Sequence, residues 1–78
     1  GKVISYKSLI IEWCQKEKKS FQFETFEDTG NEEQKYFGVK LHIDGKIIAK
    51  GRATSKKKAE EKTAQRAYFA LQEKIDKK

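Results

Sequence analysis

Hydrophobic residues near the amino terminus recur at helical spacing. They follow the i, i+3, i+4, i+7, i+8 pattern of a single helix face, in the set Tyr6, Leu9, Ile10, Trp13 and Cys14. This pattern predicts a helix over residues 5–18, with Ser5 in position to act as the N-cap. The opposite, solvent-facing side carries Lys7, Ser8, Ile11, Glu12 and Gln15. Ile11 is the exception on that side, because it is large and apolar.

A period-two alternation then predicts two strands separated by a polar loop. In the first strand, Phe21, Phe23 and Thr25 alternate with Gln22 and Glu24. Phe26 breaks this alternation, which indicates a bulge or a change of register. Residues 28–34 are polar and too numerous for a tight hairpin turn. In the second strand, Phe37, Val39, Leu41 and Ile43 point one way, and Tyr36, Gly38, Lys40 and His42 point the other.

A hairpin and a long helix complete the pattern. Asp44 and Gly45 predict a two-residue turn, because both tolerate positive φ. A third strand over residues 46–52 follows, and then a helix over residues 56–74 that Ser55 or Thr54 can cap. The buried face of this helix is expected to hold mostly small residues, namely Ala59, Thr63, Ala67, Ala70 and Leu71, with Tyr68 and Ile75 beside them.

The order of elements is therefore α-β-β-β-α, which belongs to the α+β class. Two helices packed on one face of a three-stranded antiparallel sheet are the simplest two-layer arrangement of these elements. The 78 residues have room for one domain, which we assign to residues 1–78 with an ordered core over about residues 4–75.

The charge of the chain indicates an anionic partner. Lysine and arginine number 18 against 12 acidic residues, a formal charge of +6, which suits nucleic acid, an anionic membrane or an acidic protein. We expect no membrane association, because no apolar run approaches the roughly 20 residues of a spanning helix and no signal-peptide segment is recognisable. The single cysteine, Cys14, excludes a disulfide framework and indicates a reducing, cytoplasmic setting. His42 has no partners at metal-ligand spacing, so we expect no metal site.

Three consecutive lysines, Lys56, Lys57 and Lys58, open the last predicted helix, and we call them the lysine cluster. Cations in a first turn oppose the helix dipole and repel one another, at a cost of about 0.3–1 kcal/mol each. A bound anion reverses the sign of this effect. The alternative is a charge run that serves solubility alone, but the position is a poor one for that purpose.

Consecutive helix residues point about 100° apart, so the three lysines cannot all reach one phosphate. They can reach phosphate rows on the two sides of a narrow groove, and the major groove of A-form RNA is deep and narrow. The cluster therefore suits duplex RNA better than B-form DNA.

The chain resembles the double-stranded RNA-binding domain family. The resemblance lies in the α-β-β-β-α order, in residues 45–51 and above all in Ser55-Lys56-Lys57-Lys58-Ala59-Glu60. Residues 5–13 and 59–71 look most like the carboxy-terminal domain of bacterial ribonuclease III. This resemblance implies a non-catalytic domain that binds double-stranded RNA by shape and backbone, with little sequence preference, for an RNA-processing endonuclease.

Other expectations also follow from the resemblance. The magnesium-dependent hydrolytic site would belong to a separate catalytic domain that also forms the homodimer. The present chain is then expected to be monomeric, to need no cofactor and to bind no small molecule.

The family's contact positions can be placed on this sequence. The lysine cluster would straddle the major groove, while the first helix and the loop between the first two strands enter the flanking minor grooves. Ile11 stands where many members have glutamine, so it makes an apolar contact or contributes nothing. Glu60 stands where many have another lysine. The full expected RNA-binding set is Ser8, Ile11, Glu12, Gln15, Gly30, Asn31, Glu33, Ser55, Lys56, Lys57 and Lys58, with no catalytic and no metal-ligating residue.

Two alternatives stay open. Some domains of this family bind proteins instead of RNA, and an intact lysine cluster argues against that role here. A binder of single strands or DNA would show exposed aromatic side chains, of which Tyr36 is the obvious candidate. Lys46, Lys50 and Arg52 add a general positive field or are simply exposed strand residues.

Replacing Glu33 with His should tighten the binding of duplex RNA. The family often has a histidine at this loop tip, and the carboxylates of Glu32 and Glu33 repel phosphate. The dissociation constant, measured by titration with duplex RNA, should fall. An unchanged or weaker affinity would contradict the prediction.

Overall fold

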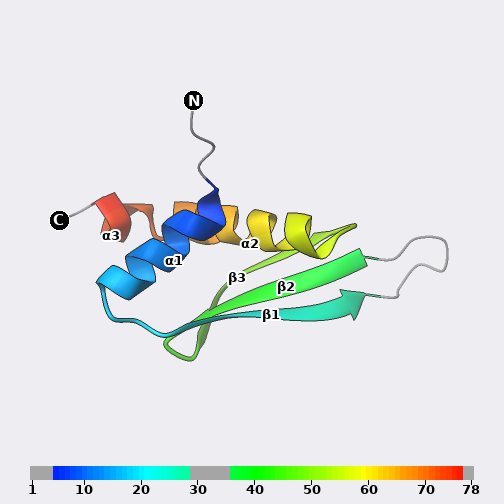
Figure 1. Cartoon of the computed structure of the whole chain (residues 1–78), viewed down its shortest axis with the longest axis horizontal. Helices are drawn as coiled ribbons and strands as arrows, with labels where there is room; N and C mark the ends of the chain where they lie inside the picture. Colours follow the sequence, from blue (N-terminus) through cyan, green and yellow to red (C-terminus); the bar gives the residue numbers. More distant parts are fainter. Residues whose placement is uncertain (1–4, 29–35, 77–78) are drawn as a thin grey trace.

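The computed structural model describes residues 5–28 and 36–76. Two helices lie on one face of a three-stranded antiparallel sheet with the strand order β1-β2-β3 (Figure 1), which confirms the predicted α-β-β-β-α fold. The elements are α1 (Tyr6–Lys16), β1 (Phe21–Asp28), β2 (Tyr36–Ile43), β3 (Lys46–Ala53), α2 (Lys56–Ala70) and the short α3 (Gln72–Asp76).

Local hydrogen bonds define both ends of α1. Ser5 caps the helix as predicted, since its side-chain oxygen accepts the Ser8 N–H at 3.0 Å. The helix ends earlier than predicted, because the backbone turns left-handed at Lys18 with φ of 57°. The Lys19 N–H then donates to the Cys14 carbonyl at 2.8 Å. This is the hydrogen bond of a Schellman motif that spans five positions of the chain.

The bulge predicted at Phe26 is wrong. β1 and β2 pair without interruption from Phe21 opposite Ile43 to Asp28 opposite Tyr36. Phe26 is an outward-pointing residue of a regular strand, and its ring covers Gly38 on the face away from the helices, where a Cβ on Gly38 would overlap it. The irregularity instead lies between β2 and β3, at Leu41 and His42.

The β2–β3 hairpin has the predicted two-residue turn. Asp44 has φ of 52° and Gly45 has φ of 81°, and two successive positive φ values define a type I′ turn. The twist of this turn matches that of the strands it joins.

The helix α2 lies unusually close to β3. A Cβ on Gly51 would lie 2.5 Å from Thr63 Oγ1 and 2.9 Å from the Thr63 backbone nitrogen. Thr63 is fully buried, and its hydroxyl donates to the Ala59 carbonyl at 2.7 Å and lies 3.2 Å from that of Val39. The small residues of the helix therefore allow contact between its backbone and the sheet.

Two details of the last helix differ from the prediction. The helix expected over residues 56–74 ends at Ala70, where Leu71 is the C-cap, and α3 follows as a separate turn. Ala70 is exposed, and the fourth small buried residue is Ala64. Because the chain changes direction at Leu71, the side chains of Leu71 and Ile75 pack against the core, while Ala70 stays exposed to solvent.

Gly51→Ala should lower the free energy of unfolding by about 1–3 kcal/mol, because the helix backbone at Thr63 must move to admit a methyl group. Gly38→Ala is the matched control. The atoms nearest to its added methyl group belong to the exposed ring of Phe26, which can turn into solvent, so its cost should be smaller. Urea unfolding of both variants measures the difference, and equal costs would contradict the close contact at Gly51.

Candidate nucleic-acid interface

The lysine cluster lies at the start of α2 as predicted. Ser55 has extended backbone angles, φ −137° and ψ 154°, and its side-chain oxygen accepts the Lys58 N–H at 3.2 Å. Lys56, Lys57 and Lys58 are all exposed, and the first turn contains no acidic residue. Three exposed lysines and the unpaired N–H groups of the helix start therefore lie together at one end of α2, where they attract anions.

The positive charge continues along α2 at four-residue spacing. Lys62 and Arg66 follow Lys58 on one side of the helix, and both donate to carbonyl groups of β3. Lys62 Nζ lies 3.4 Å from the Arg52 carbonyl oxygen, and an Arg66 guanidinium nitrogen lies 2.8 Å from that of Lys50. Sequence reasoning missed this row, although the i, i+4 spacing of its residues was visible.

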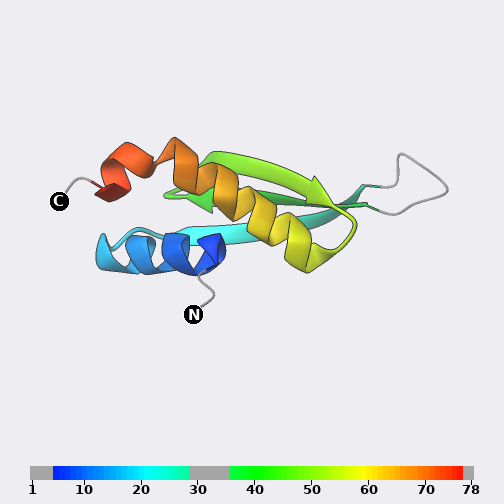
Figure 2. The same ribbon diagram turned by 90° about the horizontal axis from the view of Figure 1, so that it is seen from above.

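The candidate contact residues of α1 lie on one side of the helix. Ser8, Glu12 and Gln15 are exposed, as predicted. Ile11 is only half-exposed, so the prediction of a fully solvent-facing isoleucine is confirmed in part. The two helices lie side by side over the sheet (Figure 2), so this side of α1 and the start of α2 belong to the same layer of the molecule.

An ion pair connects α1 to α2 near the lysine cluster. Lys7 Nζ lies 2.7 Å from Glu60 Oε1, and the Lys7 backbone N–H donates to Glu61 Oε1 at 3.2 Å. The Lys7 ammonium also lies 5.4 Å from the centre of the Phe23 ring. Glu60, which departs from the family's lysine, therefore holds the first helix against the second.

Two further predictions concern the loop between β1 and β2 and the histidine of β2. Gly30, Asn31, Glu32 and Glu33 lie outside the described residues. His42 Nε2 lies 2.8 Å from Glu24 Oε1 across the β1–β2 pair.

Cys14 is fully buried, as predicted, and burial raises the pKa of its thiol, with Asp44 adding to the effect and Lys19 opposing it. Burial and a raised thiol pKa are typical of a structural core cysteine.

Within residues 5–28 and 36–76, no three histidine, cysteine, aspartate or glutamate side chains gather as they would around a metal ion. None of the helices described there has the length and apolar character needed to cross a membrane.

The sequence is similar to one protein-family profile and to several curated bacterial proteins. The family profile described as "Double-stranded RNA binding motif" matches residues 6–71. The chain is 67% identical over 76 residues to Ribonuclease 3 of Zunongwangia profunda, and 64% identical over 76 residues to Ribonuclease 3 of Flavobacterium psychrophilum. Each alignment covers 97% of this chain and 31% of the relative. A third relative, Ribonuclease 3 of Borreliella afzelii, is 35% identical over 94% of this chain and 30% of its own length.

The chain thus spans about a third of the length of the curated relatives that it matches.

A double-mutant cycle on Lys7 and Glu60 should show a favourable coupling free energy of about 0.2–1 kcal/mol, because the pair is partly exposed to water. Glu60→Lys alone should destabilise the domain by placing two cations together. The swapped pair, Lys7→Glu with Glu60→Lys, should recover most of that loss. Thermal unfolding of the four proteins measures the coupling. A coupling of zero would contradict the ion pair.

Proposed function

The chain belongs to the double-stranded RNA-binding motif family, and on that premise we propose that it binds duplex RNA through shape and backbone contacts, with little sequence preference. The observation that carries the proposal is the exposed lysine cluster at the capped start of α2. A helix start without acidic residues and with three cations is unfavourable by itself and becomes favourable beside phosphate.

In this proposal the lysine cluster binds phosphates on both sides of the narrow major groove. The side chains of Lys56, Lys57 and Lys58 diverge around the helix, so together they span a groove and do not converge on a single phosphate. Two facing phosphate rows at close spacing are a property of A-form RNA, and this geometry distinguishes it from B-form DNA.

The exposed side of α1 would enter an adjacent minor groove. Gln15 and Ser8 can donate to and accept from 2′-hydroxyl groups, and the Glu12 carboxylate can accept from them. Ile11 would make an apolar contact at the edge of this surface. Since Lys7 and Glu60 join the two helices, the spacing between the minor-groove and major-groove contacts is built into the fold. The expected footprint is about 16 base pairs.

We further propose that the chain is the substrate-binding part of a ribonuclease III-type endonuclease. Its high identity to two proteins named Ribonuclease 3, over 31% of their length, supports this parentage. The present residues would hold the substrate and perform no chemistry. The hydrolytic site with its magnesium ions, and the homodimer contact, would belong to the rest of such a cytoplasmic enzyme.

The double variant Lys56→Gln, Lys57→Gln should weaken duplex RNA binding by about tenfold or more. The slope of log affinity against log salt should become shallower by about one per lost phosphate contact. The control variant Lys46→Gln, Lys74→Gln removes the same charge at the start of β3 and in α3, away from the start of α2, and should keep the RNA affinity within about twofold. Equal losses in both variants would show a general charge effect and contradict a localised site.

Duplex RNA should bind more tightly than duplex DNA or single-stranded RNA of matched length, because the proposed contacts read A-form geometry. Titrations at two salt concentrations separate this preference from simple charge attraction. Equal affinity for the three nucleic acids would refute shape recognition. The absence of measurable RNA affinity, with the fold intact, would favour the protein-interaction role.

A further inference from the structure

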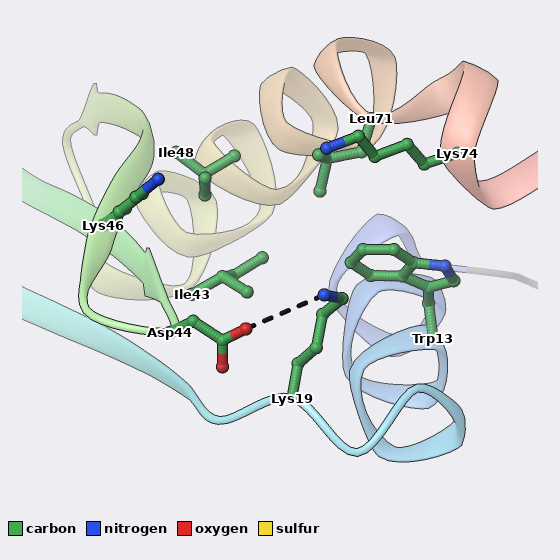
Figure 3. Close-up of a pocket in the computed structure, with 8 residues that line it drawn as sticks. All are labelled: Trp13, Lys19, Ile43, Asp44, Lys46, Ile48, Leu71 and Lys74. Carbon is green, nitrogen blue, oxygen red and sulfur yellow. Dashed lines mark ion pairs between the residues drawn. The ribbon is translucent and has the colours of Figure 1, made fainter.

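A pocket of about 190 Å³ (Figure 3) lies beside the β2–β3 hairpin, at the end of the molecule away from the start of α2 (Figure 1). Its walls come from the end of α1, the following turn, the β2–β3 hairpin, the C-cap residue of α2 and α3. The lining residues are Trp13, Lys19, Ile43, Asp44, Lys46, Ile48, Leu71 and Lys74. The 15 residues of α2 separate the pocket from the lysine cluster by about 20 Å.

The interior of the pocket is apolar. Ile43, which is 5% exposed, lies at its base. Ile48 and Leu71 are half-buried beside it, and the indole of Trp13 forms one wall. These side chains belong to the edge of the main core, so the pocket is an opening into that core and not a separate surface depression.

Three lysines surround this apolar interior. Lys19 Nζ lies 3.7 Å from Asp44 Oδ2 and 5.7 Å from the centre of the Trp13 ring, so its charge is largely compensated. Lys46 and Lys74 are exposed and have no ion pair among residues 5–28 and 36–76. The rim therefore carries a net positive charge of about two.

The backbone holds the rim in place before any ligand binds. The left-handed turn at Lys18 directs Lys19 back over α1. The Ser20 backbone N–H donates to Asp44 Oδ1 at 3.1 Å, and the Asp44 N–H donates to the Ser20 carbonyl at 3.0 Å. These reciprocal bonds join the turn after α1 to the hairpin, so a ligand would meet a preformed site.

We propose that this pocket binds an acidic peptide segment of another protein, with one large aliphatic side chain of that segment inside the pocket and its carboxylates beside Lys46 and Lys74. The volume is below the roughly 300–1,000 Å³ of sites for drug-sized ligands, which suits one side chain. Nucleic acid fits poorly, because it offers no aliphatic group and the Trp13 ring is partly covered by Lys19. The site is independent of the RNA surface.

The single tryptophan of the chain makes the pocket directly observable, because Trp13 is one of its walls. The probe is an acetylated and amidated peptide, Glu-Asp-Leu-Glu-Asp, and its saturable binding should change the Trp13 fluorescence. A peptide with glycine in place of leucine tests the apolar contact. A peptide with glutamine and asparagine in place of the acids tests the charges. Both should bind about fivefold or more weakly.

Two charge-matched variants complete the experiment. The variant Lys46→Gln, Lys74→Gln should bind the leucine peptide about fivefold or more weakly, while its affinity for duplex RNA is retained. Lys56→Gln, Lys57→Gln should do the reverse. All four lysines are exposed, so the fold should persist, and circular dichroism checks this. If the domain binds the peptide but not duplex RNA, the proposed function fails and the pocket proposal still holds.

Three outcomes would overturn the proposal. One is an unchanged Trp13 fluorescence at millimolar peptide. Another is an equal loss of peptide affinity in both lysine variants, which would show that net charge alone determines the binding. The last is competition between the peptide and duplex RNA for the same site.

Discussion

The close contact between α2 and the sheet determines where the other functional parts of this domain lie. Because Gly51 has no side chain, the helix backbone at Thr63 can approach β3 directly. The buried alanines extend this contact along the helix. A helix held at that distance presents its first turn at one end of the sheet and its last turn at the other. The lysine cluster and the apolar pocket thus depend on the same packing.

Charge placement in α2 favours binding over the stability of the isolated domain. Ser55 caps the helix, yet the first turn that it stabilises contains only lysines. Glu60 and Glu61, one turn later, are directed to Lys7 of the other helix and leave the first turn uncompensated. An anionic ligand then supplies the compensation, so the free energy lost in the unbound domain is recovered in the complex.

Local patterns in the sequence predicted the parts of the fold that local interactions determine. The Ser5 and Ser55 caps, the hairpin at Asp44 and the alternation of β2 belong to this class. Long-range contacts were not predictable, because they join residues far apart in the chain. The Lys7–Glu60 pair spans 53 positions, and it gives a structural role to an acidic residue at a position where many family members have lysine. The end of α2 and the role of Phe26 likewise depend on packing across the sheet.

The cations bonded to the edge of β3 have a consequence for association between molecules. β3 is an outer strand, and the outer strand of a sheet can recruit a strand from a neighbouring chain. Lys62 and Arg66 occupy the carbonyls of Arg52 and Lys50, which are acceptors that such a strand would need. Copies crowded along one long duplex would therefore find the β3 edge of a neighbouring sheet less available for pairing.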